Sequence, residues 1–134
     1  MRYLPDTNVW IEFLNPGENA IKRRIGSMLP GQLVVCSVVK AELYFGAERS
    51  ARQQENRNVL DGLFSELQSL PFDDTAAMHY ARVRAQLAAL GMPIGPHDLM
   101  IAAIALAHDL TVVTRNTREF SRVTDLKSED WEGD

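Results

Sequence analysis

The sequence has 134 residues, of which 46% are hydrophobic and 24% are charged, and its formal net charge is −4. These values are typical of a folded protein, so disordered, collagen-like and coiled-coil chains are excluded, and the length suits a single domain over 1–134. Cys36 is the only cysteine, which excludes a disulfide scaffold, and the longest apolar run, Leu99–Ala107, has nine residues where a membrane span needs about 20.

The first half of the chain predicts strands that alternate with helices. In order, the pattern indicates a strand at 2–5, helices at 8–14 and 19–28, a buried strand at 33–36, and a helix from 37 to about 49. An Asn-Pro-Gly breaker separates the first two helices, and Ser37 is expected to cap the last one.

The second half continues the alternation. Apolar spacing predicts a helix around Leu60–Leu67, an edge strand at 70–72, a helix from Ala76 to Gly91, a rigid loop at 91–96, a buried helix at 97–108 and a buried strand at 111–114. Short strands that alternate with helices favour an α/β fold with a parallel sheet covered on both faces. Functional residues of such sheets gather at the carboxyl ends of the strands.

Charge is unevenly distributed along the chain. The predicted acidic tail, 125–134, carries five acids and one lysine, so residues 1–124 hold 13 acids and 13 bases and are neutral. The bases form clusters at 22–24, 49–57, 82–84 and 115–122. These clusters fit either solvated helix faces or a nucleic-acid-binding surface, and both interpretations stay open. With no apolar signal region at the start, we expect a cytoplasmic protein without membrane contact.

Three acids stand where folding alone favours a different residue. Asp6 directly follows the first predicted strand. Glu42 lies in mid-helix on the apolar face, and Asp98 heads the apolar run of the buried helix. Asp6 is equally well explained as a helix cap. Asp98 has the alternative of an acid that offsets the helix dipole, and Glu42 has the less favoured alternative of a structural salt bridge. Three inward-facing acids from separate elements nevertheless favour one shared site.

A divalent cation would let these carboxylates lie close together despite their repulsion. Oxygen-only ligands select Mg²⁺ or Mn²⁺ over Zn²⁺, and the three histidines and Cys36 are too scattered to form a zinc site. The sequence has no phosphate-binding glycine loop and no nucleophile elbow. Cleavage of phosphodiester bonds assisted by a metal ion is therefore the favoured chemistry.

Four segments together resemble one known family. They are DTN after the first strand, SVVKAELYFGAERS, GPHDLMIAAIA and VVTRNTREF. In this order and spacing they are similar to the PIN-domain family, and within it to the VapC-type toxins of bacterial toxin–antitoxin pairs. The resemblance implies a three-layer α/β fold with a central parallel sheet of four or five strands. It also implies an endoribonuclease, dependent on Mg²⁺ or Mn²⁺, that cleaves structured RNA, foremost tRNA, and so inhibits translation.

The resemblance also assigns roles to particular residues. Asp6, Glu42 and Asp98 match the core acids of the family, as catalytic residues and metal ligands. The position of the usual fourth acid holds Asn116, and Glu119, one helical turn on, is expected to supply the missing carboxylate. The residues expected to orient carboxylates or water are Thr7, Asn8, Thr114 and Asn116. Capping and strand-end hydrogen bonds explain Thr7, Asn8 and Thr114 equally well.

Partners follow from the same resemblance. We expect a cognate VapB-like antitoxin that inserts a basic side chain in the acidic pocket, an RNA substrate, and a homodimer. His97 is expected to be structural, Trp10 and Phe13 to lie in the core or at a dimer contact, and Trp131 to fold the tail back onto the domain. Two other hypotheses remain: a phosphatase or receiver-like domain with Asp6 as phosphoryl acceptor, and a degenerate PIN fold that only binds RNA or a partner.

Overall fold

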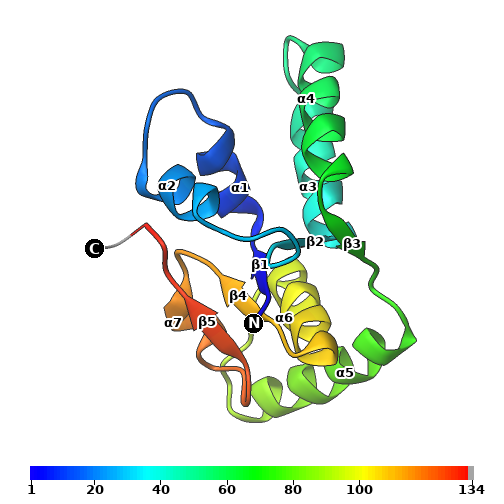
Figure 1. The fold of residues 1–134 in the computed structure, drawn as a ribbon. Coiled ribbons are helices and arrows are strands. Elements are labelled where there is room, and N and C mark those ends of the chain that lie inside the picture. The colour runs from blue at the N-terminus through cyan, green and yellow to red at the C-terminus, as the bar shows by residue number, and fades with distance from the viewer. Residues whose placement is uncertain (133–134) are drawn as a thin grey trace.

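The computed structural model describes residues 1–132, which form an α/β fold (Figure 1). The strands among these residues are β1 (Tyr3–Pro5), β2 (Val34–Cys36), β3 (Gln68–Leu70), β4 (Thr111–Val113) and β5 (Lys127–Glu129). The helices are α1 (Thr7–Leu14), α2 (Ala20–Gly26), α3 (Ser37–Glu48), α4 (Gln53–Ser65), α5 (Asp74–Ala89), α6 (Pro96–His108) and α7 (Thr117–Phe120).

All strand pairs in the described chain are parallel. One sheet has the order β1-β4-β5, and β2 pairs with β3 in a second ladder. A bridge between Tyr3 and Leu33 joins the two ladders, so the strands follow one another in the order β3-β2-β1-β4-β5. The prediction of a parallel sheet with four or five strands is confirmed in this form.

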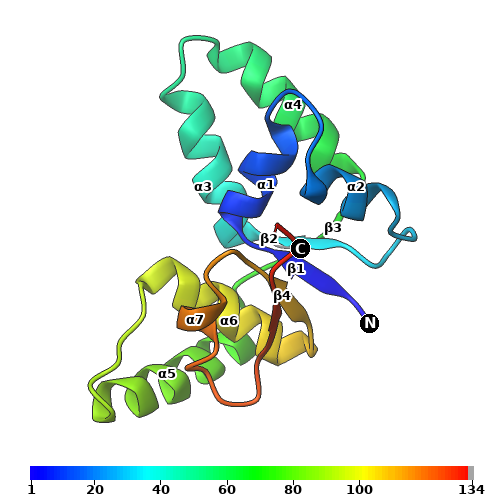
Figure 2. The same ribbon diagram turned by 90° about the vertical axis from the view of Figure 1, so that its left-hand side faces the viewer.

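Helices cover both faces of the sheet. In Figure 2, α1 to α4 lie on one side of the strands, and α5, α6 and α7 lie on the other. The α3–α4 pair extends away from the sheet. On the other side, α5 packs against α6 and lies at the bottom of the view in Figure 1. None of the helices in residues 1–132 is long and apolar enough to cross a membrane.

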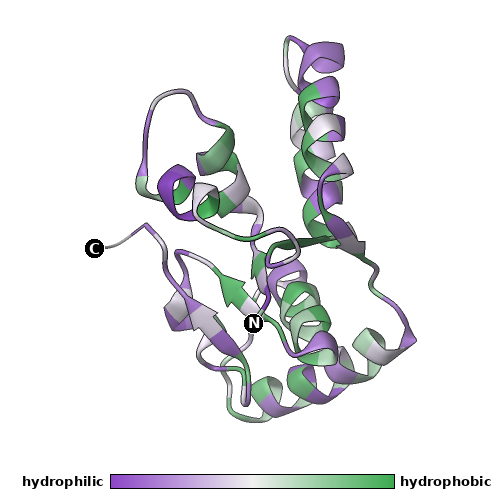
Figure 3. Cartoon of the chain, in the orientation of Figure 1, coloured by the Kyte–Doolittle hydropathy of each residue, from purple (hydrophilic) through white to green (hydrophobic). Residues whose placement is uncertain are grey.

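The core lies between β1, β4 and α6. Leu4, Val112, Ile101 and Ile104 are completely or almost completely buried, and Figure 3 shows α6 and β4 as predominantly hydrophobic segments. Trp10 is also buried, with the ring of Phe13 packed edge-on at 5.5 Å between centroids. Burial of these apolar surfaces is the main source of stability, so α6, and the acid at its start, are held firmly in place.

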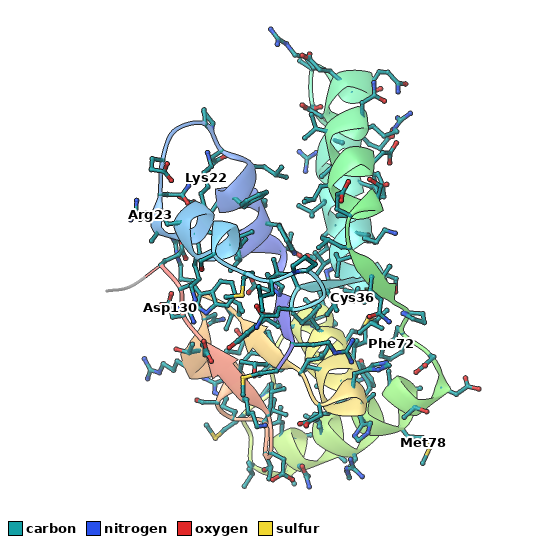
Figure 4. All side chains as sticks on the ribbon, in the orientation of Figure 1. Lys22, Arg23, Cys36, Phe72, Met78 and Asp130 are labelled. Carbon is teal, nitrogen blue, oxygen red and sulfur yellow. The ribbon has the colours of Figure 1, made fainter. Side chains whose placement is uncertain are left out.

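Two local predictions need correction. Ser37 does not cap α3: Cys36 occupies the cap position without a side-chain bond, and the Ser37 hydroxyl instead accepts the backbone N–H of Phe72 at 3.2 Å. Cys36 and Phe72 are labelled in Figure 4. The strand expected at 70–72 lies at Gln68–Leu70, because Pro71 has no N–H to continue the ladder.

The acidic tail is partly a strand, which its polar sequence did not predict. Residues 127–129 extend the sheet as β5, and Trp131 is buried against Tyr3, with ring centroids 5.1 Å apart. The expectation that Trp131 folds the tail back is thus confirmed. Residues 133 and 134 of the predicted tail lie outside the described residues.

Candidate active site

The site begins where β1 and β4 end side by side. Pro5 pairs with Val113, and the backbone N–H of Asp6 donates to the carbonyl of Val113 at 2.9 Å. Asp6 and Thr114, the next residue of each strand, are therefore neighbours, and the Thr114 side chain hydrogen-bonds to the Asp6 carboxylate. Both residues are buried. Parallel pairing thus places a buried acid at the carboxyl edge of the sheet.

Asp6 has a second role as the cap of α1. Its Oδ1 atom accepts the backbone N–H of Val9 at 3.1 Å, so the predicted cap and the predicted site coincide in one side chain. Burial raises the pKa of Asp6, and the carboxylates of Glu132 and Glu42 raise it further, while the bonds from Thr114 and Val9 lower it. The charged form of Asp6 is therefore unfavourable without a cation nearby.

Glu42 projects from the middle of α3 and is half-buried. Thr7 donates its hydroxyl to Oε1 of Glu42 at 2.7 Å, and Nδ1 of His97 lies 3.2 Å from Oε2. Within residues 1–132 no lysine or arginine pairs with Glu42. In this part of the chain, the exposed His97 is therefore the one possible partner for the salt bridge considered as an alternative. The contact with Thr7 fixes one carboxylate oxygen.

Asp98 lies in the first turn of α6, at the head of the buried helix. Partial burial raises its pKa to about 6, assisted by the negative charges of Glu119, Asp6 and Glu42, whereas His97 lowers it. The structure therefore brings Asp98 within electrostatic reach of the other three predicted acids. The four acids come from the loop after β1, from α3, from α6 and from α7.

Glu119 and Asn116 form the fourth side of the site. Oε1 of Glu119 accepts the backbone N–H of Gly95 at 3.0 Å, and Asn116 donates its amide to the other oxygen. The backbone N–H of Asn116 in turn donates to Oγ1 of Thr114 at 2.9 Å. Glu119 thus shares a face with Asn116 as predicted, and is tied to the loop that leads into α6.

The remaining predicted residue, Asn8, is exposed and lines an adjoining groove of about 620 Å³. Thr7, Glu42 and His97 line the polar side of this groove. Sequence reasoning missed three contacts of the site: His97 on Glu42, the Gly95 amide on Glu119, and the charge of Glu132 near Asp6. Of these three contacts, only that of His97 could have been suspected from the sequence, because His97 is next to Asp98.

The donor atoms suit a hard cation. Carboxylate, hydroxyl and amide oxygens predominate, while Cys36 is buried in the core with its pKa raised to about 11 by desolvation. Within the part of the chain described, no three acidic, histidine or cysteine side chains converge as a ready metal-binding group. The hydrogen bonds described above turn Glu42 and Glu119 toward their own partners, so coordination would require these side chains to reorient.

Comparison with known protein families agrees with this geometry. The family model described as "PIN domain" matches residues 3–126. The chain belongs to the PIN domain family. The PIN domain thus spans β1 through the turn before β5, and all four acids lie inside it.

Curated relatives and solved structures narrow the assignment within the PIN domain family. A "tRNA(fMet)-specific endonuclease VapC" of Shigella flexneri is 38% identical over 98% of both chains, and the Salmonella typhimurium protein of that name is 37% identical over the same shares. "Ribonuclease VapC2" of Haemophilus influenzae is 35% identical over 98% of both chains. These relatives confirm the prediction of a VapC-type endoribonuclease.

Two crystal structures share the fold over nearly the whole chain. The DNA-bound VapBC of Salmonella typhimurium has a TM-score of 0.90 at 37% identity and covers 98% of each chain. VapBC-1 of nontypeable Haemophilus influenzae has a TM-score of 0.90 at 32% identity and covers 99% of this chain and 100% of that one. The predicted three-layer α/β fold is confirmed.

Proposed function

We propose that this PIN domain is a cytoplasmic toxin that cleaves tRNA with Mg²⁺ or Mn²⁺ at the carboxyl edge of its sheet. Asp6, Glu42 and Asp98 are the proposed metal ligands, and Glu119 is the proposed fourth acid. One observation carries the proposal: carboxylates from four separate elements gather around Asp98, whose pKa is raised by burial and by the charges of Glu119, Asp6 and Glu42. No structural role requires that arrangement.

A bound Mg²⁺ or Mn²⁺ would activate a water molecule and offset the negative charge that develops on the phosphate. Neutral donors of the chain orient the acids in the absence of the ion, and Glu42 and Glu119 would turn from these donors toward it on binding. Thr114 bonds to Asp6, Thr7 to Glu42, and Asn116 to Glu119, so each of these acids has a neutral donor that orients it. Such donors restrict a carboxylate to a few rotamers without cancelling its charge.

Initiator tRNA is the substrate we propose. The relatives in Shigella flexneri and Salmonella typhimurium are named as tRNA(fMet)-specific, and each matches this chain over 98% of its length. A chain of this size has few surfaces with which to read RNA, so close full-length relatives favour a shared substrate class.

We also propose a VapB-like antitoxin and a homodimer. Solved VapBC structures at 37% and 32% identity contain a toxin of this fold. An arginine of the antitoxin can bridge two of the carboxylates with its planar fork, and the net negative charge of the site favours this. Complex formation should then weaken at high salt and compete with Mg²⁺.

The test of function is a cleavage assay with the purified chain. Initiator tRNA, an elongator tRNA, single-stranded DNA and a phosphomonoester are each incubated with Mg²⁺, Mn²⁺ or EDTA. The proposal predicts cleavage of initiator tRNA with either metal and none in EDTA. Hydrolysis of the phosphomonoester alone would favour the phosphatase hypothesis, although none of the three lysines follows a late strand as that chemistry needs. RNA binding without cleavage in any metal would favour the degenerate fold.

A further inference from the structure

Arg115 and Glu132 form an ion pair beside the acidic site. Nε of Arg115 donates to one Glu132 oxygen at 2.7 Å, and a terminal nitrogen donates to the other at 2.6 Å. Arg115 directly follows Thr114, which bonds to Asp6, and Glu132 adds its charge to the field at Asp6. The pair therefore lies at the edge of the proposed catalytic centre.

The tail holds Glu132 in this position through several anchors. Trp131 is buried against Tyr3, its indole N–H donates to Glu129 at 3.0 Å, and the guanidinium of Arg24 lies 4.8 Å from its ring. The N–H of Glu132 donates to Asp130 at 2.8 Å, and Figure 4 places Asp130 just beyond β5, near the helix that carries Arg23. Glu132 reaches Arg115 because this short segment is fixed to the sheet.

The two partners differ in exposure. The side chain of Arg115 is 69% exposed, whereas that of Glu132 is 18% exposed. An RNA phosphate arriving from solvent can therefore reach the guanidinium directly. The carboxylate engages the Arg115 fork through two parallel bonds, which is also the geometry in which arginine binds a phosphate.

We propose that Arg115 binds a backbone phosphate of the RNA substrate, and that Glu132 occupies its fork as a phosphate mimic until RNA displaces it. This inference rests on the proposed function, because the RNA must lie across the acidic site. The need for such a cation is electrostatic: Asp6, Glu42, Asp98 and Glu119 repel a polyanion, and Glu132 adds to that repulsion while it holds Arg115. When the RNA binds, its phosphate displaces Glu132 from Arg115 and takes over the two hydrogen bonds.

The experiment measures kcat and KM for tRNA cleavage in Mg²⁺ with Arg115→Ala, Glu132→Gln and the double variant. Arg115→Ala should raise KM about fivefold and reduce the salt dependence of binding by about one phosphate contact. Glu132→Gln should lower KM about fivefold, since a neutral amide competes poorly with phosphate. In the Arg115→Ala background, Glu132→Gln should change KM by less than twofold, because only the loss of one negative charge near the site remains.

Lys127→Ala and Asp109→Asn are matched controls. They change the charge equally, and their ion pair of 3.7 Å lies at the amino ends of β4 and β5, away from the site. Asn also tolerates the left-handed backbone of Asp109 (φ 53°). Both controls should leave KM within twofold of the unsubstituted value.

Three outcomes would overturn the inference: an unchanged KM for Arg115→Ala, a fivefold Glu132→Gln benefit that is undiminished without Arg115, or equal KM shifts in the controls. The first outcome would mean that the pair only anchors the tail. The other two would mean that net charge, rather than a contact of Arg115 with phosphate, sets KM. Kd values for a fluorescein-labelled RNA stem–loop in EDTA should follow the same order, and any other order contradicts the inference. Because that assay needs no cleavage, it separates this inference from the proposed function, which fails if no tRNA is cut.

Discussion

The two ends of the parallel sheet carry their acids in opposite settings. At the amino ends, the Asp109 side chain is 91% exposed and pairs with Lys127 at 3.7 Å. At the carboxyl ends, Asp6 is 6% exposed, and Asp98 has a pKa of about 6 because burial and three other acids disfavour its charge. The first arrangement costs little in water, whereas the second costs stability, a cost that the proposed metal site would explain.

Cavity size alone does not separate these two regions. The amino-end region has its own pocket of about 500 Å³, lined by His79, Arg82, Asp109 and Asp125 among others. Charges of both signs are mixed there, so each acid has a nearby base or solvent. The carboxyl edge is distinguished instead by its acids: within residues 1–132 no lysine or arginine pairs with Asp6, Glu42, Asp98 or Glu119, and only the exposed His97 lies against Glu42.

The largest expected effect is the loss of cleavage in Asp98→Asn. Asp98 is a proposed metal ligand, so its removal should lower the rate at least about 10²-fold, which is roughly the largest effect of groups that only orient ligands. Asp109→Asn is the matched change at the other end of the sheet and should leave the rate within twofold. Cleavage of initiator tRNA by both variants, with unfolding followed by circular dichroism, checks this. Comparable rates for Asp98→Asn and Asp109→Asn would erase the contrast between the two ends.

A smaller effect is expected for Glu119→Gln, which tests whether Glu119 acts together with the other three acids of the site. If Glu119 replaces the family's fourth acid, its loss should raise the Mg²⁺ concentration for half-maximal cleavage about tenfold. Asn116→Asp restores an acid at the family position and is the companion variant. An unchanged Mg²⁺ curve for Glu119→Gln, together with mild activation by Asn116→Asp, would show that three acids suffice.

The smallest effect concerns stability without metal. Asp98 binds its proton more tightly in the folded state, with a pKa of about 6, than at the ordinary value of 3.8. Its contribution to folding is therefore present below about pH 4 and is lost as the pH rises through 6. In EDTA at pH 8, Asp98→Asn should melt about 2–4 °C above the unsubstituted protein, and this advantage should shrink toward pH 4.5. Thermal unfolding at both pH values tests this, and a constant or negative difference would contradict it.

The sequence predicted the elements whose side chains carry a periodic apolar pattern. Buried strands such as β4 and the buried helix α6 lie where expected, since their apolar residues specify their own burial. β5 escaped prediction because Lys127–Glu129 is a polar edge strand whose position depends on backbone bonds to β4. The role of Ser37 does not follow from the local sequence, because its partner, Phe72, lies 35 residues away.

The candidate site residues stay a prediction, and the sequence singles them out for related reasons. Asp6, Glu42 and Asp98 conflict with the local apolar pattern, and this conflict is visible in the sequence itself. The contacts of His97 with Glu42 and of Arg115 with Glu132 depend on tertiary packing between separate elements. Only the folded chain brings such pairs together.

The central claim is that the carboxyl edge of the sheet binds the catalytic ion, and a crystal soaked in Mn²⁺ tests it most directly. The account predicts an anomalous difference peak with oxygens of at least two of Asp6, Glu42 and Asp98 at about 2.0–2.3 Å, after the side chains reorient. A fully occupied Mn²⁺ ion bound instead at the amino ends, near Asp109 and Asp125, or no peak at the carboxyl edge at saturating Mn²⁺, would contradict it.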